Sequence, residues 1–368
     1  MSDLSIKKYI FRKGAACHIP VSGTFELTPR CNLNCEMCYI HMSPAEESKI
    51  GTERSTEEWI QLGRKAVDAG MIYLLLTGGE PLLRKDFCTI YTELAQMGIL
   101  ISLNTNATLM SEEMIRCLSA HLPEKVNVTL YGASSGTYQK VCGDAGGYEK
   151  TVHGIRMLKA AGIPVSINTT FTKNNAKDME DIVSFAKQEH IPIRMASYLF
   201  PPVRCNREAN ESCFLSPETY GQMSAHFDAI TMNPEQKEKR LSVLQAIAEK
   251  KSPIPEEGES RASSCMAGRG AFWITWDGHM LPCGMLPTFG AEVNPDNFED
   301  VWAGMKDLMD QIKLPRKCSV CNSKSVCPTC AAVSQSVHED TTIVPEEMCR
   351  FTEAYISSVL TNRMIEQP

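Results

Sequence analysis

The chain has 368 residues, of which 43% are hydrophobic and 22% are charged, an ordinary composition for a globular protein with one large and one smaller domain. Its formal net charge of -7 gives no electrostatic reason to expect a nucleic-acid partner. The sequence shows neither a secretory signal nor an apolar run of membrane-spanning length. We therefore expect a cytoplasmic protein with no membrane partner, whose 16 cysteines serve as metal ligands rather than disulfides.

The N-terminal half alternates strand-like and helix-like segments. A strand is expected at 24–28, and a helix with a capping box at Ser55 and Glu58 ends at Gly70. Further strands are expected at 72–76, 100–104, 126–130, 165–168 and 193–196, with helices at about 86–97, 111–120, 148–160 and 176–189. This alternation predicts an α/β fold with a parallel sheet of six units, too few for a closed eight-unit barrel.

Three polar stretches follow strands, at 78–81, 104–106 and 129–132. Sites of barrel folds lie at the carboxyl ends of strands, and paired glycines let a ligand approach the backbone closely. A lone Gly-Gly-Glu-Pro sequence is more often a simple turn. Its position after the second strand, downstream of a cysteine-rich loop, favours a binding site.

That loop carries Cys31, Cys35 and Cys38 in the spacing C-x3-C-x2-C, directly after the first strand. Thiolate is the ligand that iron–sulfur clusters use, and three ligands leave one iron of a cubane open for a substrate or cofactor. Structural zinc sites more often use four protein ligands. Buried cysteines or a zinc knuckle are the alternative interpretations.

The loop resembles the signature of the radical S-adenosylmethionine (radical SAM) enzymes. The resemblance implies a partial (β/α)6 TIM-type barrel and a [4Fe-4S] cluster with SAM at its open iron. It also implies reductive cleavage of SAM to a 5′-deoxyadenosyl radical that abstracts a hydrogen atom from substrate. Adenine would lie beside Tyr39, the SAM amino group at 77–81, and the ribose or carboxylate at Asn106 and Thr129. The implied SAM residues are Tyr39, Thr77, Gly78, Gly79, Glu80, Asn106 and Thr129.

Beyond a connecting segment at 201–262, a second cysteine-rich region begins. The connecting segment should contain a helix starting at Ser216-Pro217, a charged helix at about 235–250 and a Pro/Glu-rich linker at 252–260. An aromatic strand at 272–276 and the Asp277-Gly278 turn then predict a β-hairpin. The hairpin would bring Cys283 back toward Cys265. Five more cysteines follow, and read alone they also fit a zinc ribbon: Cys318, Cys321, Cys327, Cys330 and Cys349.

Together these seven cysteines resemble the SPASM extension of radical SAM enzymes, which implies two auxiliary iron–sulfur clusters, expected to be [4Fe-4S]. The resemblance assigns one cluster to Cys318, Cys321, Cys327 and Cys349. It assigns the other to Cys265, Cys283 and Cys330. The spacing departs from the SPASM pattern by one residue, because two positions rather than three separate Cys327 from Cys330. For the three-thiol cluster, an open iron, an upstream ligand such as Cys213 and a different nuclearity remain alternatives.

The expected domains follow from these segments. They are an N-terminal extension at 1–22, the partial barrel at 23–200, the connecting segment at 201–262, a small Cys-rich α+β SPASM domain at 263–352 and a tail at 353–368.

Several other residues are candidates for chemistry. Cys142 follows the fourth strand, near where substrate is expected, and could donate a hydrogen atom to a substrate radical. A buried small hydrophobe or free thiol is the alternative for it and for Cys17, Cys88, Cys117, Cys205 and Cys213. The candidate proton acceptors are Glu26, Glu80, Asp144 and Asp277, for which a cap or surface carboxylate is the commoner explanation.

The SPASM resemblance implies oxidation of a peptide or protein side chain. We expect maturation of a ribosomally synthesised peptide through a thioether or other crosslink, with a flavodoxin- or ferredoxin-type reductant. About 23 residues precede the first strand, so leader recognition would need a separate leader-peptide-binding protein or another surface of this one.

Three alternatives remain. One is an anaerobic sulfatase-maturing, formylglycine-generating enzyme, against which Gly284 counts, because the resemblance places an Asp directly after the second SPASM cysteine. Another is a radical SAM dehydrogenase or epimerase acting on a sugar or amino acid. The last is a non-enzymatic iron–sulfur carrier or structural zinc protein.

Overall fold

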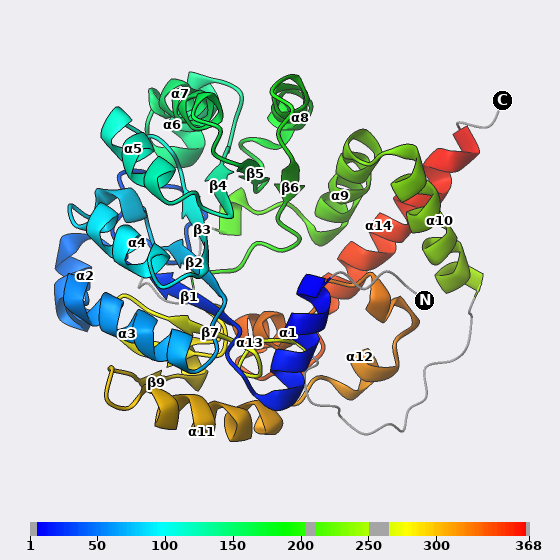
Figure 1. The fold of residues 1–368 in the computed structure, drawn as a ribbon. Coiled ribbons are helices and arrows are strands. Elements are labelled where there is room, and N and C mark those ends of the chain that lie inside the picture. Colours follow the sequence, from blue (N-terminus) through cyan, green and yellow to red (C-terminus); the bar gives the residue numbers. More distant parts are fainter. Residues whose placement is uncertain (1–5, 203–210, 250–264, 366–368) are drawn as a thin grey trace.

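The computed structural model describes residues 6–202, 211–249 and 265–365, and Figure 1 shows their arrangement. The predicted linker at 252–260 and Cys205 lie outside these ranges. Within the described ranges, no helix is both long and apolar enough to cross a membrane.

The predicted alternation of strands and helices is confirmed through the N-terminal half of the chain (Figure 1). The strands are β1 (Ser22–Glu26), β2 (Tyr73–Thr77), β3 (Leu100–Thr105), β4 (Lys125–Thr129), β5 (Val165–Thr169) and β6 (Ile193–Met195). The helices are α1 (Ile6–Cys17), α2 (Pro44–Ile50), α3 (Thr56–Asp68), α4 (Phe87–Ala95), α5 (Glu112–Ala120), α6 (Ser135–Cys142), α7 (Gly147–Ala160) and α8 (Met179–Gln188).

Local sequence explains where α3 begins. The Ser55 side chain accepts the Glu58 N–H, and the Glu58 carboxylate accepts the Ser55 N–H, so the predicted capping box is confirmed. The α3 residues Trp59, Leu62 and Ala66 are fully buried in the main hydrophobic core. Burial of this apolar face rather than helix propensity fixes the helix on the barrel.

The first strand ends earlier than predicted, at Glu26 rather than residue 28. Two hydrogen bonds join the next residues to the end of β2, from the Leu27 N–H to the Thr77 carbonyl at 2.8 Å and from the Gly79 N–H to the Thr28 carbonyl at 2.7 Å. Pro29 then has no N–H to extend a ladder. The chain therefore leaves the sheet and enters the cysteine loop.

The six parallel strands form part of a larger sheet of nine strands, in the order β6-β5-β4-β3-β2-β1-β7-β8-β9. The last three are β7 (Ala271–Ile274), β8 (His279–Leu281) and β9 (Ala291–Glu292). The predicted hairpin is confirmed, since β7 and β8 pair antiparallel around Gly278, whose φ of 87° favours glycine. β7 also pairs in parallel with β1, so the barrel and the cysteine-rich region share one sheet.

The remaining helices surround the cysteine-rich region and the open edge of the barrel. They are α9 (Pro217–Thr231), α10 (Pro234–Glu249), α11 (Phe298–Gln311), α12 (Arg316–Val320), α13 (Ala331–His338) and α14 (Glu346–Ile365). Ser216 caps α9 with Pro217 at its first position, as predicted. Figure 1 shows α14 running beside α9 and α10, and Phe351 of α14 packs on Tyr220 of α9.

Candidate active site

A cavity of about 530 Å³ lies at the carboxyl ends of the barrel strands. Its wall includes all three cysteines of the 31–38 loop and all the predicted SAM residues except Glu80. Cysteines and polar strand ends that are distant in sequence therefore meet around one space. The lining residues that had been predicted are Cys31, Cys35, Cys38, Tyr39, Thr77, Gly78, Gly79, Asn106 and Thr129.

Two glycines hold the cysteine loop against β2. A Cβ on Gly79 would lie 2.2 Å from the Arg30 carbonyl oxygen, and one on Gly78 would lie 2.5 Å from that of Thr28. The Glu80 N–H donates to the Arg30 carbonyl at 2.8 Å. Glycine is required here because the two backbones touch, whereas the sequence had suggested that the glycines admit a ligand.

The donor set of the loop fits an iron–sulfur cluster. All three cysteines are free thiols, and their sulfurs are soft ligands on one wall of an open cavity. The Leu33 N–H donates to Cys31 Sγ at 3.4 Å, and the His41 N–H donates to Cys38 Sγ at 3.3 Å. Burial raises the pKa of Cys31, so binding of a metal cluster to this thiol would release its proton.

Glu80 lies beneath the cavity rather than in its wall, and its contact with SAM stays a prediction. Its carboxylate is fully buried and accepts the Asn106 N–H at 2.7 Å, the Thr105 hydroxyl at 2.7 Å and the Leu82 N–H at 3.1 Å. Burial raises the pKa of Glu80 to about 7 despite these donors. Glu80 therefore positions Asn106, whose Nδ2 faces Cys31 Sγ at 3.7 Å.

Cys142 is also placed differently from the prediction. It is the last residue of α6, is fully buried in the hydrophobic core and does not line the cavity. Its carbonyl accepts the Asn34 N–H of the cysteine loop at 2.8 Å. In the structure Cys142 therefore packs in the core, and its role as a hydrogen donor stays a prediction.

The other candidate proton acceptors lie outside the cavity wall as well. Glu26 is buried and accepts the Trp273 indole N–H at 3.0 Å across the β1–β7 pair. Asp144 pairs with Lys150 at 3.0 Å, and Asp277 accepts the Thr275 hydroxyl at 2.5 Å in the hairpin turn. These carboxylates therefore serve structure.

Most of the C-terminal cysteines lie around one small cavity. Cys318, Cys321, Cys327 and Cys349 all line this cavity of about 60 Å³, and so does Cys330, which the resemblance assigns to the other set. Each is a free thiol, and the division into two ligand sets stays a prediction. Burial is the main cause that raises the pKa of Cys349 to about 11, with nearby Cys318 and Cys327 adding to it. These four sulfurs fit the ligand set of a cubane cluster.

The second set comprises Cys265, Cys283 and Cys330. Burial raises the pKa of Cys330, and Cys265 lies close enough to add to the shift. Cys283 and Cys330 pack on the same small hydrophobic cluster. Cys213, the suggested upstream ligand, is buried in the main core beside Glu36 and Lys173, where the structure gives that suggestion no support.

Sequence reasoning missed the far wall of the main cavity. This wall comes from the ends of β5 and β6 and the segment after β6: Asn168, Thr169, Thr170, Arg194, Met195, Ala196, Ser197, Tyr198, Leu199 and Phe200. The rule that selected Thr77 and Asn106, a polar residue at a strand end, would also have selected Asn168 and Arg194. The aromatic residues carry no such signal, because they follow the last barrel strand.

Comparisons with known proteins agree with this geometry. The profile of the radical SAM superfamily matches residues 25–186, which include the cysteine loop and the strands around the main cavity. An AdoMet-dependent heme synthase of Methanosarcina barkeri is 28% identical over 337 residues, covering 86% of this chain and 93% of that protein. A PqqA peptide cyclase of Rhodopseudomonas palustris is 27% identical over 294 residues, covering 77% of this chain and 74% of that protein.

Solved structures share the fold over nearly the whole chain. Native anSMEcpe with bound AdoMet and Cp18Cys peptide matches with a TM-score of 0.66 at 17% identity, covering 94% of this chain and 98% of that chain. Streptococcus suis SuiB bound to the precursor peptide SuiA matches with a TM-score of 0.63 at 15% identity, covering 92% and 79%. At these identities the likeness shows the fold alone. It extends through the cysteine-rich C-terminal region, so the predicted partial barrel with a cysteine-rich extension is confirmed.

The superfamily match covers the loop, the glycine turn and the strand ends on which the prediction rested. The match implies a [4Fe-4S] cluster and SAM, which the free thiols and the open cavity can accommodate. Residues 25–186 of the chain are therefore similar to the radical SAM superfamily.

Proposed function

We propose that this enzyme uses SAM to oxidise a side chain of a peptide or protein substrate, in the maturation of a ribosomally synthesised peptide. When bound at the 31–38 loop, the cluster and SAM supply hydrogen-atom abstraction. The thiols of Cys31, Cys35 and Cys38 would hold the cluster. The glycine turn and Asn106 would hold SAM against it. The rest of the chain must then bind the substrate and remove a second electron from the substrate radical.

This proposal depends on aromatic residues that line the main cavity and also lie near the auxiliary cysteines. Tyr198 and Phe200 line the main cavity, and their rings meet edge-to-face with centroids 4.8 Å apart. Phe200 also packs against a small group of buried hydrophobic residues, and Cys283 and Cys330 pack against the same group. Burial raises the pKa of Tyr198 to about 12, and Cys330 lies near enough to contribute. An auxiliary cluster at these thiols would lie next to the substrate wall and could accept the second electron.

Some residues line two neighbouring cavities at once, and this arrangement suits an elongated substrate. Ser197, Tyr198 and Leu199 also line a neighbouring cavity of about 190 Å³. Met348 of that cavity in turn lines the cavity at Cys318 and its partners. Neighbouring cavities that share wall residues would suit an extended chain better than a single compact molecule. The similarity to PqqA peptide cyclases and to the peptide-bound folds points the same way.

A heme-forming reaction is the second candidate. The heme synthase of Methanosarcina barkeri is similar over 93% of its own length, more than the peptide cyclase. Arg194 in the main cavity could pair with a carboxylate of a porphyrin side chain.

The test uses deuterium transfer into 5′-deoxyadenosine. Reconstituted holoenzyme with SAM and a strong reductant is given the peptide fraction of cells grown on deuterated amino acids, or the same fraction after exhaustive protease digestion. Iron coproporphyrin with deuterated side chains is the parallel substrate. We expect deuterated 5′-deoxyadenosine from the undigested peptide fraction only. Deuterated 5′-deoxyadenosine formed with the digested peptide fraction, or formed only with the porphyrin, would overturn the peptide assignment.

A further inference from the structure

The strand β6 is an edge of the sheet. The strand order ends at β6, and none of the described residues forms a further strand beside it. The Pro192 carbonyl accepts the Ile167 N–H, and the Ala196 N–H donates to the Thr169 carbonyl, so these groups face β5. Backbone direction alternates along a strand, so Ile193 and Met195 direct their N–H and C=O groups to the open edge. Such an edge can pair with an added strand.

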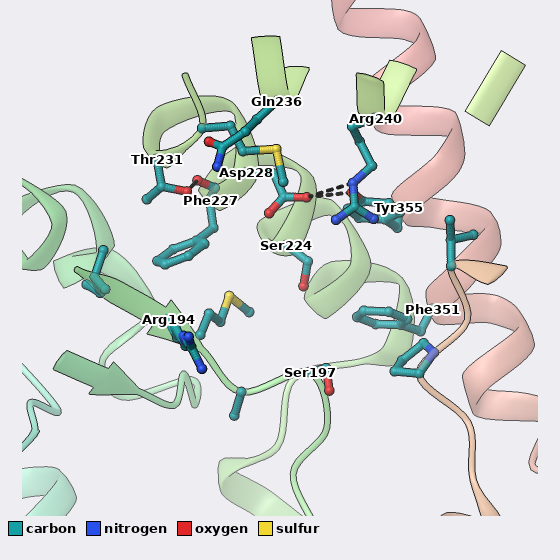
Figure 2. Close-up of a pocket in the computed structure, with 16 residues that line it drawn as sticks. Arg194, Ser197, Ser224, Phe227, Asp228, Thr231, Gln236, Arg240, Phe351 and Tyr355 are labelled. Carbon is teal, nitrogen blue, oxygen red and sulfur yellow. Dashed lines mark hydrogen bonds and ion pairs between the residues drawn. The ribbon is translucent and has the colours of Figure 1, made fainter. Parts of the chain in front are cut away.

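A cavity of about 470 Å³ lies along this edge, between β6 and the helices α9, α10 and α14. Figure 2 shows Arg194 on the strand side and Arg240 on the helix side, with Phe227 and Phe351 between them. The cavity is separate from the main one but shares Arg194 through Ser197 with it. A chain lying along β6 would therefore lead directly toward the main cavity.

The charged groups of this cavity favour an anionic occupant. Its lining contains two guanidinium groups, Arg194 and Arg240, and one carboxylate, Asp228. Asp228 accepts the Tyr355 hydroxyl at 2.5 Å and forms a long ion pair with Arg240 Nε at 4.0 Å, so the two guanidinium groups outnumber the one carboxylate of the lining. Within the described part of the chain, no carboxylate pairs with Arg194. The lining of this cavity thus carries an excess of positive charge, although the chain as a whole has a net charge of -7.

We propose that this cavity docks an extended acidic segment of the peptide substrate, which pairs with the edge of β6 and places carboxylates on Arg194 and Arg240. The inference rests on the proposed function, because the occupant is the substrate of that reaction. Main-chain pairing would supply affinity, the two arginines would select acidic side chains, and the shared 194–197 wall would deliver the following residues to the main cavity.

The test measures binding of fluorescein-labelled peptides to holoenzyme with SAM by fluorescence anisotropy. The probes are alternating Val-Glu, Val-Gln and Val-Lys peptides of equal length. We expect the Val-Glu probe to bind at least about tenfold more tightly than the others. Arg240→Gln should weaken it by about tenfold, whereas Lys239→Gln, which removes an exposed charge of the same helix outside the cavity, should not. SAM cleavage without peptide should be unchanged in Arg240→Gln, because Arg240 lies outside the main cavity.

Strand addition is tested with the peptide itself, which avoids misfolded variants. Two Val-Glu probes carry N-methyl groups on alternate amides, in opposite registers, and one register should bind about tenfold less tightly than the other. Equal binding by both registers, or by the Val-Glu and Val-Gln probes, would overturn the inference. If the enzyme modifies peptides but the Val-Glu probe does not bind, only the docking site is wrong. If the probe binds as expected but no peptide is modified, the docking site stands and the proposed function fails.

Discussion

The cysteine loop at 31–38 and the cysteine segment at 316–330 both present closely spaced thiols, but different contacts fix them. The loop is tied to distant parts of the chain, since Asn34 and Glu36 donate to the Cys142 and Val141 carbonyls. Leu33, Cys35 and Met37 of the loop are buried in the main core. The loop is therefore held by tertiary structure that does not depend on its thiols.

The 316–330 segment is held mostly by its own backbone. The N–H groups of Cys318, Lys324 and Cys327 donate to carbonyls only three or four positions earlier. The helix α12 has five residues, and none of them is buried. Short local turns without a core are marginal in water. The comparison predicts that the barrel loop is ordered without a bound cluster, whereas the 316–330 segment would take much of its order from a cluster bound to its thiols.

Removing iron should give the largest difference between the two regions. After anaerobic chelation of the reconstituted enzyme, hydrogen exchange of amides in 316–330 should rise by about a hundredfold or more. Exchange at 33–38 should rise by less than about tenfold, because tertiary hydrogen bonds persist there. Hydrogen-exchange mass spectrometry before and after chelation measures both, and an equal rise in the two regions would remove the distinction.

Gly79→Ala should damage the preorganised site directly. The added Cβ would meet the Arg30 backbone, which cannot move without displacing the loop, so we expect a loss of about 2–4 kcal/mol of unfolding free energy and weakened SAM binding. Gly304→Ala is the matched control, because no atom lies within 4 Å of its Cβ and it sits in helix α11. It should stabilise the protein by up to about 1 kcal/mol. Denaturant titration distinguishes the two, and similar effects would argue against close backbone contact.

Glu80→Gln tests the support beneath the cavity. An amide cannot accept from the Asn106 N–H, the Thr105 hydroxyl and the Leu82 N–H as a carboxylate does, so we expect a loss of about 1–3 kcal/mol. SAM affinity measured by calorimetry should fall with it, as Asn106 shifts. The exposed Glu57→Gln should change stability by less than about 0.5 kcal/mol. Unchanged SAM affinity in a folded Glu80→Gln protein would reject the positioning role.

The smallest expected effect concerns helix caps within the barrel. Ser55→Ala removes the capping box of α3, whose apolar face is buried, and should lower stability by about 1 kcal/mol. Ser43→Ala removes an equivalent box from α2, which has no buried residue, so its effect on global stability should be smaller. Thermal unfolding of the two variants compares them, and a larger loss for Ser43→Ala would mean that α2 is part of the cooperative barrel.

Much of the barrel could be predicted because its signals are local. The apolar run 72–76, the Ser55 cap and the Asp277-Gly278 turn each fix an element within a few residues of themselves. The polar stretch around α2 was not recognised as a helix, although Ser43, Pro44 and Glu46 form the same cap signal as at α3. The helix α2 was therefore predictable from its cap.

The remaining differences depend on tertiary contacts that no local pattern encodes. Pairing of β7 with β1 joins residues about 250 positions apart, so the sequence could not reveal that the two regions share a sheet. Whether Glu80 faces a ligand or the backbone of Asn106 depends on how β3 lies beside β2. Cys142 is sealed by the packing of α6, a helix that had not been expected. The sequence thus predicted which kinds of residue form the site, but it could not predict how individual side chains are oriented.

The most direct test of the radical SAM assignment compares the wild-type enzyme with the triple variant Cys31→Ala/Cys35→Ala/Cys38→Ala. Both are reconstituted anaerobically with iron and sulfide, then given SAM and a strong reductant, and 5′-deoxyadenosine and iron are quantified. We predict that only the wild type forms 5′-deoxyadenosine and that the variant, still folded, holds about four fewer irons while keeping its auxiliary iron. SAM cleavage by the triple variant at the wild-type rate would contradict the assignment of the 31–38 loop.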